Sequence, residues 1–298
     1  MRFVDNSQVY TVISRNNEPS LTVNPGEVFQ VHTELCTGQW LQTLEDIFDY
    51  ESIERAGANP CVCIEVAGAK PGDMLAVDIV GIIPDNIGYT HLDGEHDQLP
   101  YLIRQKSWGY YHKNVRIENG FILWDDKRKL PIRPMIGTLA TAPDREALLA
   151  TRGGSYGGNM DAQEVCAGAT IYFPVSVPGA LLHIGDMHAI QGDGELNGAG
   201  GIECRGTVTL RAEILPRPAG MKWLRAENDE YIMAIACCRT TDESFYAASC
   251  ELIQFVTERS GISDEQAYML LAQVMHARCT QFINPTRTYV CKVAKKYL

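Results

Sequence analysis

Imidazole and carboxylate side chains are concentrated in one glycine-rich stretch, HIGDMHAIQGDGE, at positions 183–195. Its polar members are His183, Asp186, His188, Gln191, Asp193 and Glu195. Imidazole and carboxylate are the ligands that zinc takes in catalytic sites, where three of them leave a position open for water. Because the stretch lies between two β runs, we expect a turn that holds a metal or an active site. A polar structural loop is the alternative.

A second glycine-rich stretch, GGSYGGNMDAQEV at positions 153–165, offers both a nucleophile and a ligand. Ser155 lies between two glycine pairs, but a serine nucleophile needs a base, and the preceding lysines lie in a charged run typical of a solvated surface. The sequence also lacks the apolar strand that leads into a nucleophile elbow. We therefore interpret Ser155 as a loop residue and expect Asn159 and Asp161 to join the downstream cluster.

Three alternatives to a catalytic metal site remain open. In the first, Cys166 is the nucleophile of a thiol hydrolase, but this region has no lysine of the kind that nitrilase-like enzymes combine with their cysteine. In the second, the chain is a non-catalytic β-sandwich protein that binds a metal or a small molecule, although the H-x-H pair of cupins is missing. In the third, a binding or scaffold protein has kept the fold and lost the chemistry.

The bulk composition excludes some classes of protein. The chain has 298 residues, enough for one large domain or two packed parts. Its net charge of -11 argues against binding nucleic acid and allows a neutral or cationic substrate. It has no long apolar run, so we expect no membrane association, and its first residues do not resemble a secretory signal. Its ten cysteines form no disulfide framework, which predicts reduced thiols in a cytoplasmic protein.

The first two thirds of the sequence have the alternation typical of β-strands. We expect strands in VFQVHTEL, CIEV, MLAVDIVGI, ATIYFPVSV and GIECRGTVTLRAEI. In the last of these, Cys204, Val208 and Leu210 face inward, whereas Glu203 and Arg205 face outward. Residues 91–101 have the composition of an exposed loop.

The hydrophobic period changes near the C-terminus. Helical spacing predicts a helix over residues 242–259 that stops at Gly261, and Ser263 with Gln266 forms a capping-box pattern that opens a second helix. A proline- and glycine-bearing segment follows residue 215. We therefore expect a β-rich core over residues 1–215 and an α+β C-terminal part, residues 216–298, packed on it.

Several of these segments together resemble the acetamidase/formamidase family. They are GGNMD, PVSVPGALLHIGDMHAIQGDGE, NPCVCIEVAGAKPGDMLAVDI and IGTLATAP, and the resemblance covers most of residues 25–215. It implies a mainly β fold with α/β parts, a jelly-roll-like β-sandwich with a smaller α+β subdomain and C-terminal helices. It also implies a homo-oligomeric amidohydrolase that converts a short aliphatic amide, such as acetamide or formamide, to carboxylate and ammonia with a divalent metal. Zinc is the first candidate for this metal and calcium the second.

The resemblance also implies roles for single residues. The metal ligands that it predicts are Asp161, Asp186, His188 and His32. The catalytic residues that it predicts are Glu195, Glu34 and Asn159, and the groups that hold the amide substrate are Gln191 and Asn159. Whether Glu195 is a ligand or a base stays open.

Two segments depart from the family pattern. HTEL at positions 32–35 stands where relatives have roughly ET-x-D, so His32 or Glu34 replaces a carboxylate if that strand lines the site. Cys61-Val62-Cys63 stands where relatives tend to have Thr-Gly-Pro. Either departure predicts an altered pocket and an amide other than acetamide or formamide.

Overall fold

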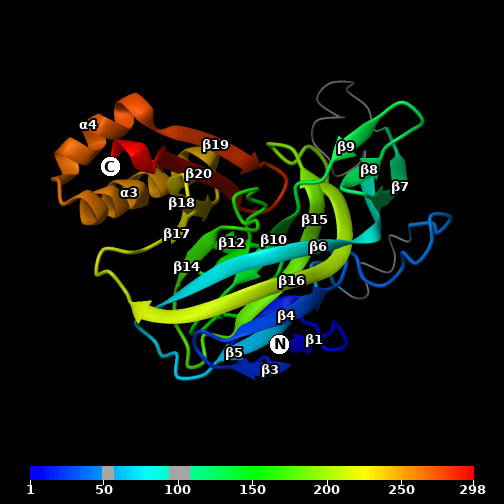
Figure 1. The fold of residues 1–298 in the computed structure, drawn as a ribbon, viewed down its shortest axis with the longest axis horizontal. Helices are drawn as coiled ribbons and strands as arrows, with labels where there is room; N and C mark the ends of the chain where they lie inside the picture. The colour runs from blue at the N-terminus through cyan, green and yellow to red at the C-terminus, as the bar shows by residue number, and fades with distance from the viewer. Residues whose placement is uncertain (49–56, 94–107) are drawn as a thin grey trace.

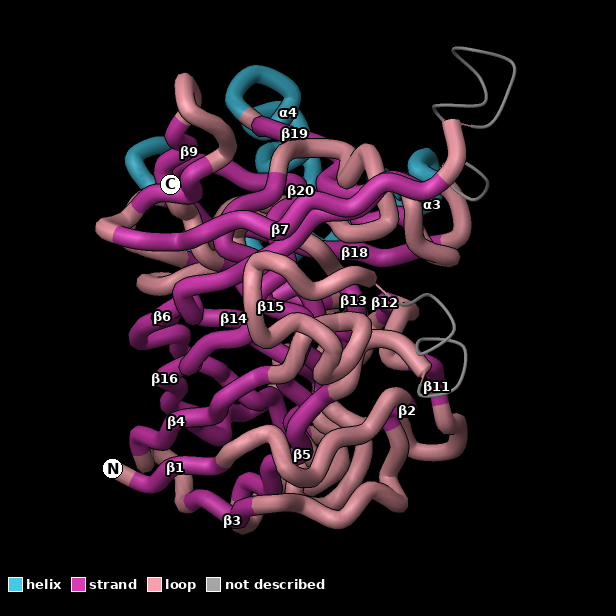
Figure 2. The backbone as a smooth tube through the Cα atoms, turned by 90° about the vertical axis from the view of Figure 1, so that its right-hand side faces the viewer, coloured by secondary structure: helices cyan, strands magenta, loops and turns pink. Residues whose placement is uncertain are grey.

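The computed structural model describes residues 1–48, 57–93 and 108–298, and this part of the chain is mainly β. Strands fill most of the molecule, and the two helices, α3 and α4, lie together at one end (Figures 1 and 2). The expected mainly β fold with C-terminal helices is confirmed. In the described residues, the helices are too short or too polar to cross a membrane.

Eighteen of the strands belong to one curled sheet, and β2 and β11 form a second, small sheet. The strands of the N-terminal half are β1 Arg2–Val4, β2 Val12–Ile13, β3 Leu21–Val23, β4 Val28–Thr33, β5 Cys61–Val66, β6 Asp73–Asp93, β7 Tyr110–Glu118, β8 Phe121–Leu123, β9 Lys129–Pro131, β10 Met135–Ala140 and β11 Leu148–Leu149. Those of the C-terminal half are β12 Gly153–Gly154, β13 Gly157–Asn159, β14 Thr170–Pro174, β15 Leu182–Gln191, β16 Gly201–Pro216, β17 Leu224–Glu227, β18 Tyr231–Cys238, β19 His276–Gln281 and β20 Arg287–Ala294. A short 3₁₀ helix, Lys295–Tyr297, ends the chain.

Two long antiparallel strands, β6 and β16, cross the molecule side by side (Figure 1). Their pairing runs from Asp73 with Pro216 to Tyr89 with Glu203, and it is interrupted by two β-bulges. Bulges bend a strand and increase its twist. This curvature, together with β4, β14 and β15 alongside, wraps the sheet around one large apolar core.

The burial that the alternation predicted in β16 holds over most of the strand but is wrong at its start. Cys204, Val208 and Leu210 are buried as expected. Glu203 is also buried, with 2% of its surface exposed, whereas the alternation placed it outside. The register shifts between Cys204 and Gly206, but the extra residues belong to β6, so the pleat of β16 is unbroken and Glu203 still faces away from Cys204. Glu203 is buried because His188 of β15 covers that face, with its Nε2 3.0 Å from Glu203 Oε1.

The segment between His183 and Gln191 is a strand, not the turn that the sequence predicted. β15 is hydrogen-bonded to β10, β16 and β5, and the turn begins only after Gln191. Asp and Gly are poor strand formers, but pairing with neighbours on both sides overrides this preference. The polar side chains are therefore held on a rigid element.

The C-terminal helices confirm the capping patterns. α3, Thr241–Ser260, begins with a capping box between Thr240 and Glu243 and stops at Gly261, whose φ is 67°. α4, Asp264–Val274, begins with the predicted capping box of Ser263 and Gln266. α3 packs on β18 and β20, and α4 packs on α3 and β20, through a second apolar cluster. Because β17 pairs with both β14 and β18, the sheet continues past residue 216, and the domain boundary there stays a prediction.

His183, at the start of β15, is a buried neutral histidine. Its Nδ1 lies 2.8 Å from the main-chain oxygen of Leu181, and its Nε2 lies 2.9 Å from Asn17 Nδ2. These partners assign the tautomer, because Nδ1–H must donate to the carbonyl and Nε2 must accept from the amide. Burial lowers the pKa of His183 to about 4.

We expect acid to destabilise the protein through His183. Below the ordinary histidine pKa of about 6.5, the unfolded chain binds a proton that the folded chain excludes, so the free energy of unfolding falls by about 1.4 kcal/mol for each pH unit. The decrease in the free energy of unfolding ends near pH 4, at the folded-state pKa of His183, and totals about 3 kcal/mol. Urea unfolding of wild type and His183→Gln over this pH range measures the share of the pH dependence that is due to His183. An equal pH dependence in both proteins would contradict the assignment.

Candidate functional site

Three predicted ligands meet in the interior of the molecule. Asp161, Asp186 and His188 each offer one ligand atom, and these atoms lie within 4.8 Å of one another. His188 Nδ1 lies 4.0 Å from Asp161 Oδ1. All three side chains are almost completely buried. The sequence placed Asp161 in a different glycine-rich stretch from the other two, and the fold brings the stretches together.

Neighbouring strands position these side chains. Asp186 and His188 are two residues apart on β15 and so point to the same face of the sheet. The adjacent strand β10 carries Gly137, and a Cβ atom there would lie 2.5 Å from Asp186 Oδ2 and 2.6 Å from Asp161 Oδ1. Such contacts are too close for any side chain, so glycine at this position lets the two carboxylates converge over the strand.

The backbone is strained at the site. Asn59, Asp161, Asp186 and Glu195 have φ values of 56°, 45°, 57° and 45°, in the left-handed region that non-glycine residues rarely occupy. Each such residue costs about 1–3 kcal/mol, and strain of this kind clusters at active sites and ligand clamps. Four such residues in one cluster therefore mark it as a functional site.

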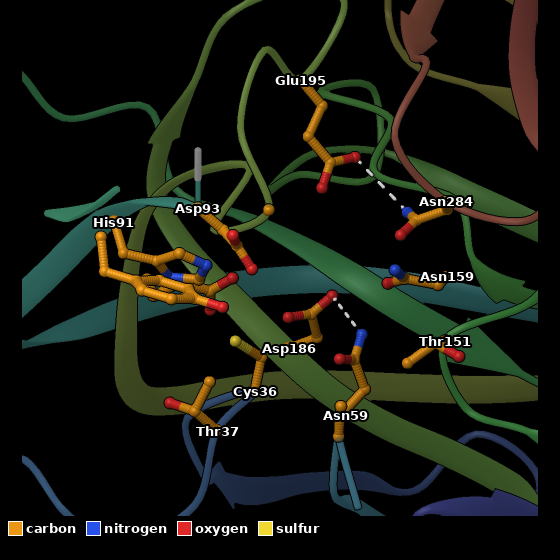
Figure 3. Close-up of a pocket in the computed structure, with 14 residues that line it drawn as sticks. Cys36, Thr37, Asn59, His91, Asp93, Thr151, Asn159, Asp186, Glu195 and Asn284 are labelled. Carbon is orange, nitrogen blue, oxygen red and sulfur yellow. Dashed lines mark hydrogen bonds between the residues drawn. The ribbon is translucent and has the colours of Figure 1, made fainter. Parts of the chain in front are cut away.

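Side-chain amides and a hydroxyl hold the carboxylates in place (Figure 3). Asn59 Nδ2 donates to Asp186 Oδ2 at 2.9 Å. Asn284 Nδ2 donates to Asp161 Oδ2 at 2.8 Å and more weakly to Glu195 Oε2 at 3.4 Å. Thr138 Oγ1 lies 3.3 Å from the same oxygen of Asp186. The site therefore draws on segments from three distant parts of the chain.

Glu203 faces the second nitrogen of His188. Its Oε1 lies 3.0 Å from His188 Nε2, on the side of the imidazole away from Asp161. A carboxylate next to the outer nitrogen of a ligating histidine fixes the tautomer and the orientation of the ring. Glu203 is thus placed to orient His188 so that Nδ1 points at the carboxylates.

The electrostatics of the cluster reflect its burial. Burial raises the pKa of Asp161, Asp186 and Glu195 above their usual range, and the mutual repulsion of these carboxylates and Glu203 adds to the effect. Burial alone lowers the pKa of His188, but Glu203, Asp186 and Asp161 outweigh it and raise the value to about 10. Without another cation, this centre therefore binds protons to balance its charge.

A cavity of about 300 Å³ opens beside the cluster. Figure 3 shows the side chains that point into it, with Asp186 at its centre and Glu195 opposite Cys36. The lining residues are Cys36, Thr37, Ala58, Asn59, His91, Asp93, Tyr110, Thr151, Asn159, Asp186, Glu195, Gly198, Glu203 and Asn284. One wall is backed by aromatic rings, because His91 stacks on Phe48 and Tyr89. The cavity has room for a small polar substrate.

The donor set fits a divalent cation. Asp161 Oδ1 and His188 Nδ1 are buried and make no hydrogen bond to the described residues. Two carboxylates and an imidazole form a set that zinc accepts, with a further position left for water or substrate. A calcium ion would take oxygen ligands only, which the imidazole does not supply.

The other predicted site residues lie at different places around the cluster. Glu195 and Asn159 line the cavity. Asn159 Oδ1 accepts a hydrogen bond from Thr138 Oγ1 at 2.7 Å. Gln191 is buried beside the cluster, where its Nε2 lies 3.5 Å from the main-chain oxygen of Asp161. The predicted roles of these three residues stay predictions.

Two predicted residues lie apart from the cluster, which corrects the placement of the early strand. His32 is on the partly exposed face of β4, and its Nε2 lies 3.3 Å from Asp85 Oδ2. Glu34 is buried, and its carboxylate already accepts a hydrogen bond from Asn6 and pairs with Arg205. The sequence left open whether this strand lines the site, and in the structure the cavity is lined by the following residue, Cys36, and not by residues 32–35.

Three further residues that the sequence analysis considered, Asp193, Ser155 and Cys166, lie outside the cluster. Asp193 is more than half exposed and pairs with Arg278, so it does not join the cluster. Ser155 is exposed in the tight turn between β12 and β13, consistent with its interpretation as a loop residue. Cys166 is partly buried, and burial raises the pKa of its thiol, which disfavours the nucleophilic thiolate.

Sequence reasoning missed Cys36, Asn59, Glu203 and Asn284. Asn59 lies in the NP pair of the family-like segment, and this was the one available signal for it. Glu203 was missed because the alternation in β16 predicts an exposed side chain there, whereas His188 of β15 covers it. Cys36 and Asn284 lie in loops far from the glycine-rich stretches, and only the fold brings them to the cavity.

Comparison with known proteins gives matches over much of the chain. Residues 134–292 match the model of the acetamidase/formamidase family. The chain is 27% identical over 270 residues to an acetamidase of Mycolicibacterium smegmatis, a match that covers 65% of the chain and 63% of the relative. The matches cover at most 63% of the length of the curated relatives.

Solved structures are similar over almost the whole chain. An acetamidase from Bacillus halodurans is 29% identical, with a TM-score of 0.91 and coverage of 99% of this chain and 98% of the other. A predicted acetamidase/formamidase from Thermoanaerobacter tengcongensis is 30% identical, with a TM-score of 0.89 and coverage of 99% and 96%.

Proposed function

Since the chain belongs to the acetamidase/formamidase family, we propose that it hydrolyses a short aliphatic amide to a carboxylate and ammonia. The observation that carries the proposal is the buried group of Asp161, Asp186 and His188, which lies beside a cavity lined by Glu195 and Asn159. A homo-oligomeric state and a cytoplasmic location remain predictions from the sequence.

We further propose that this group holds a divalent cation, with zinc favoured over calcium because of the imidazole. Such an ion, when bound, lowers the pKa of a coordinated water to about 7 and polarises a carbonyl group. Asp161, Asp186 and His188 would be its ligands, with Glu203 holding His188 in the ligating orientation. Asp161 Oδ1 and His188 Nδ1 are buried and have no hydrogen-bond partner among the described residues, which supports this assignment.

Asn159 is suited to hold the amide oxygen of the substrate. Asn59 Nδ2 lies 3.3 Å from Thr138 Oγ1, and Thr138 Oγ1 donates to Asn159 Oδ1 at 2.7 Å. The Thr138 hydroxyl has one proton, and the shorter contact, 2.7 Å to Asn159 against 3.3 Å to Asp186, favours Asn159 Oδ1 as its acceptor. The NH₂ group of Asn159 is then left to donate to a substrate carbonyl in the cavity, where the donation strengthens as the oxygen gains negative charge.

Glu195 is suited to carry the proton that the reaction must move. Amide hydrolysis needs a proton taken from water and one given to the departing nitrogen. Burial, Asp161 and Asp186 raise the pKa of Glu195, so the neutral acid persists at pH values where an exposed glutamate is ionised. The donor atoms that lie together belong to Asp161, Asp186 and His188, which favours Glu195 as acid and base over Glu195 as ligand.

The test of the proposed activity is product formation from a panel of short amides, such as formamide, acetamide and propionamide. We expect equal amounts of ammonia and carboxylate from at least one of them. His32, Glu34 and the CVC segment of β5 do not line the cavity, so these departures from the family pattern do not point away from acetamide or formamide. Bound metal without turnover of any amide in the panel would instead favour a non-catalytic binding protein of the same fold.

A further inference from the structure

A network of charged side chains, the Arg278 network, lies beside the candidate site. Glu164 is buried, and its Oε1 and Oε2 each lie 2.8 Å from Arg278 Nη2. Lys292 Nζ donates to Glu164 Oε1 at 2.9 Å, and Arg278 Nη1 donates to Asp193. None of these four is among the described residues that line the cavity. Arg278 therefore joins two acidic residues from different turns without reaching the place where a substrate would bind.

Both acidic residues of the Arg278 network lie close in the chain to residues that the proposed function uses. The buried one is three positions after Asp161, in residues 160–165, the Asp161 turn. The exposed one is two positions before Glu195, in residues 192–200, the Glu195 turn. Asp161 and Glu195 both have a φ of 45°, and such a backbone conformation persists only where the surrounding structure holds it. Each turn therefore needs contacts from outside itself.

Strand β19 and the segment after it contact both turns. Gly194 donates its main-chain N–H to the oxygen of Thr280 at 2.9 Å and accepts from the main-chain nitrogen of Phe282 at 3.0 Å. Thr280 Oγ1 donates to the main-chain oxygen of Met160 at 3.4 Å. In Figure 1 the end of β19 lies next to the turn that follows β15. Asn284 donates to a site carboxylate in each turn, so these contacts place the two turns relative to each other.

Arg278 supplies the charged contacts of this set. Burial alone raises the pKa of Glu164, but Arg278 and Lys292 outweigh it and lower the value, so the carboxylate stays ionised. The guanidinium is planar and rigid, so the separation of its two terminal nitrogens is fixed, whereas a lysine has one nitrogen to offer. The direct link between the turns, from Gln163 Nε2 to the main-chain oxygen of Gly192 at 3.0 Å, is a single neutral hydrogen bond. Among the described residues, Arg278 is the one cation that pairs with an acid in each turn.

We infer that Arg278 is a positioning residue for amide hydrolysis, which holds the Asp161 turn and the Glu195 turn at the spacing that the reaction needs. The inference rests on the proposed function. Reacting groups must be held in a near-attack arrangement, and a misplacement of about 1 Å by a change far from the chemistry can cost about 10²-fold in rate. Because Arg278 does not line the cavity, its loss acts through the positions of Asp161 and Glu195 and not through a contact with substrate.

Arg278→Ala tests this role. Lys292 still pairs with the buried Glu164, so the variant should fold. We expect kcat for the amide that the wild type hydrolyses to fall by about 10²-fold with little change in KM, the pattern for loss of an interaction made in the transition state. Hydrogen–deuterium exchange followed by mass spectrometry should show faster exchange in peptides from both turns. Arg278→Lys should recover part of kcat, because one ammonium can pair with Glu164 or Asp193 but cannot hold both at a fixed spacing.

Asp193→Ala is a second variant that does not put the fold at risk, because Asp193 is more than half exposed. It removes one of the two acidic partners of Arg278, so we expect a smaller loss of kcat and faster exchange confined to the Glu195 turn. In the double variant with Arg278→Ala, kcat should equal that of Arg278→Ala alone, because the effect of Asp193 passes through Arg278. Losses that add would overturn the inference, because independent effects add.

Arg211→Ala is the matched control. Arg211 Nε and Nη2 pair with Asp78 of the neighbouring strand β6, at 2.8 Å and 2.5 Å, and not with either turn. The change removes a comparable ion pair and should leave kcat and the exchange of both turns unchanged.

Wild-type kcat, or unchanged exchange of both turns, in folded Arg278→Ala would overturn the inference. If that variant does not fold, wild-type kcat and exchange in Asp193→Ala would overturn it. If the wild type hydrolyses no amide, the proposed function fails, but the exchange measurement still decides whether Arg278 holds the two turns. Faster exchange in both turns would then support that role, and unchanged exchange would overturn it.

Discussion

Glu195→Gln is expected to leave the metal bound and to lower kcat by about 10²- to 10⁴-fold, the usual range for loss of a general acid–base group. Glutamine has nearly the same shape and can keep the contact with Asn284, which now lies 3.4 Å from Glu195 Oε2. It cannot take up a proton from water or return one to the leaving nitrogen. Metal content and kcat of purified variant and wild type, measured side by side, test the role.

The matched control for this experiment is Ser155→Ala. Ser155 is exposed at a hairpin turn, so the change should leave both metal content and kcat near wild type. Loss of metal together with activity in Glu195→Gln would make Glu195 a ligand and not the base. Wild-type values for both quantities would show that the proton is carried elsewhere. A large loss of activity in Ser155→Ala, with the fold intact, would restore a serine-amidase mechanism.

His188→Ala is expected to lower metal affinity by more than the roughly 10- to 100-fold that follows loss of an outer-shell partner, because it removes a ligand itself. Activity should fall with metal occupancy and recover in part at high metal concentration. Equilibrium dialysis against graded zinc concentrations, followed by assay of the same samples, measures both effects.

His32→Ala is the control that tests the corrected ligand set. His32 is paired with Asp85 on β4 and lies outside the cluster, so its loss should not change zinc affinity. If His32→Ala lost metal as His188→Ala does, the early strand would have to contribute a ligand. If neither variant lost metal, the cation would have to bind elsewhere.

The parts of the fold that local chemistry determines could be predicted from the sequence. Capping boxes at Thr240 and Ser263 depend on residues three positions apart, and the second of them was recognised directly. Alternation identified the inward face of β16 because that strand is half-buried over most of its length. These features depend on near neighbours in the chain.

The site could be predicted only where its members share a stretch of sequence. Asp186 and His188 were found because they lie two positions apart. Glu203 was expected to be exposed because it lies on the face of β16 opposite Cys204, but His188 of the neighbouring strand covers that face at this end, and alternation in one strand does not show what a neighbouring strand covers. Asn284 and Cys36 come from opposite ends of the chain, and nothing local indicates that they meet.

The strained residues give a second reason why the site was only partly predicted. Asp161, Asp186 and Glu195 adopt positive φ although their types do not require it, whereas a glycine at such a position would have been recognised. Surrounding hydrogen bonds, such as the one from Asn59 to Asp186, hold this conformation. Local preference and tertiary structure therefore disagree at the residues that we assign to the chemistry.

The most direct test of metal-dependent amide hydrolysis is to remove the metal and add single ions back. Protein stripped with a chelator receives zinc, calcium, manganese or nickel separately, and ammonia release and metal per chain are measured in the same samples. We predict that turnover falls with the metal, returns with zinc and does not return with calcium, because His188 is a ligand. Full turnover by protein that contains well under one metal ion per chain would contradict the account.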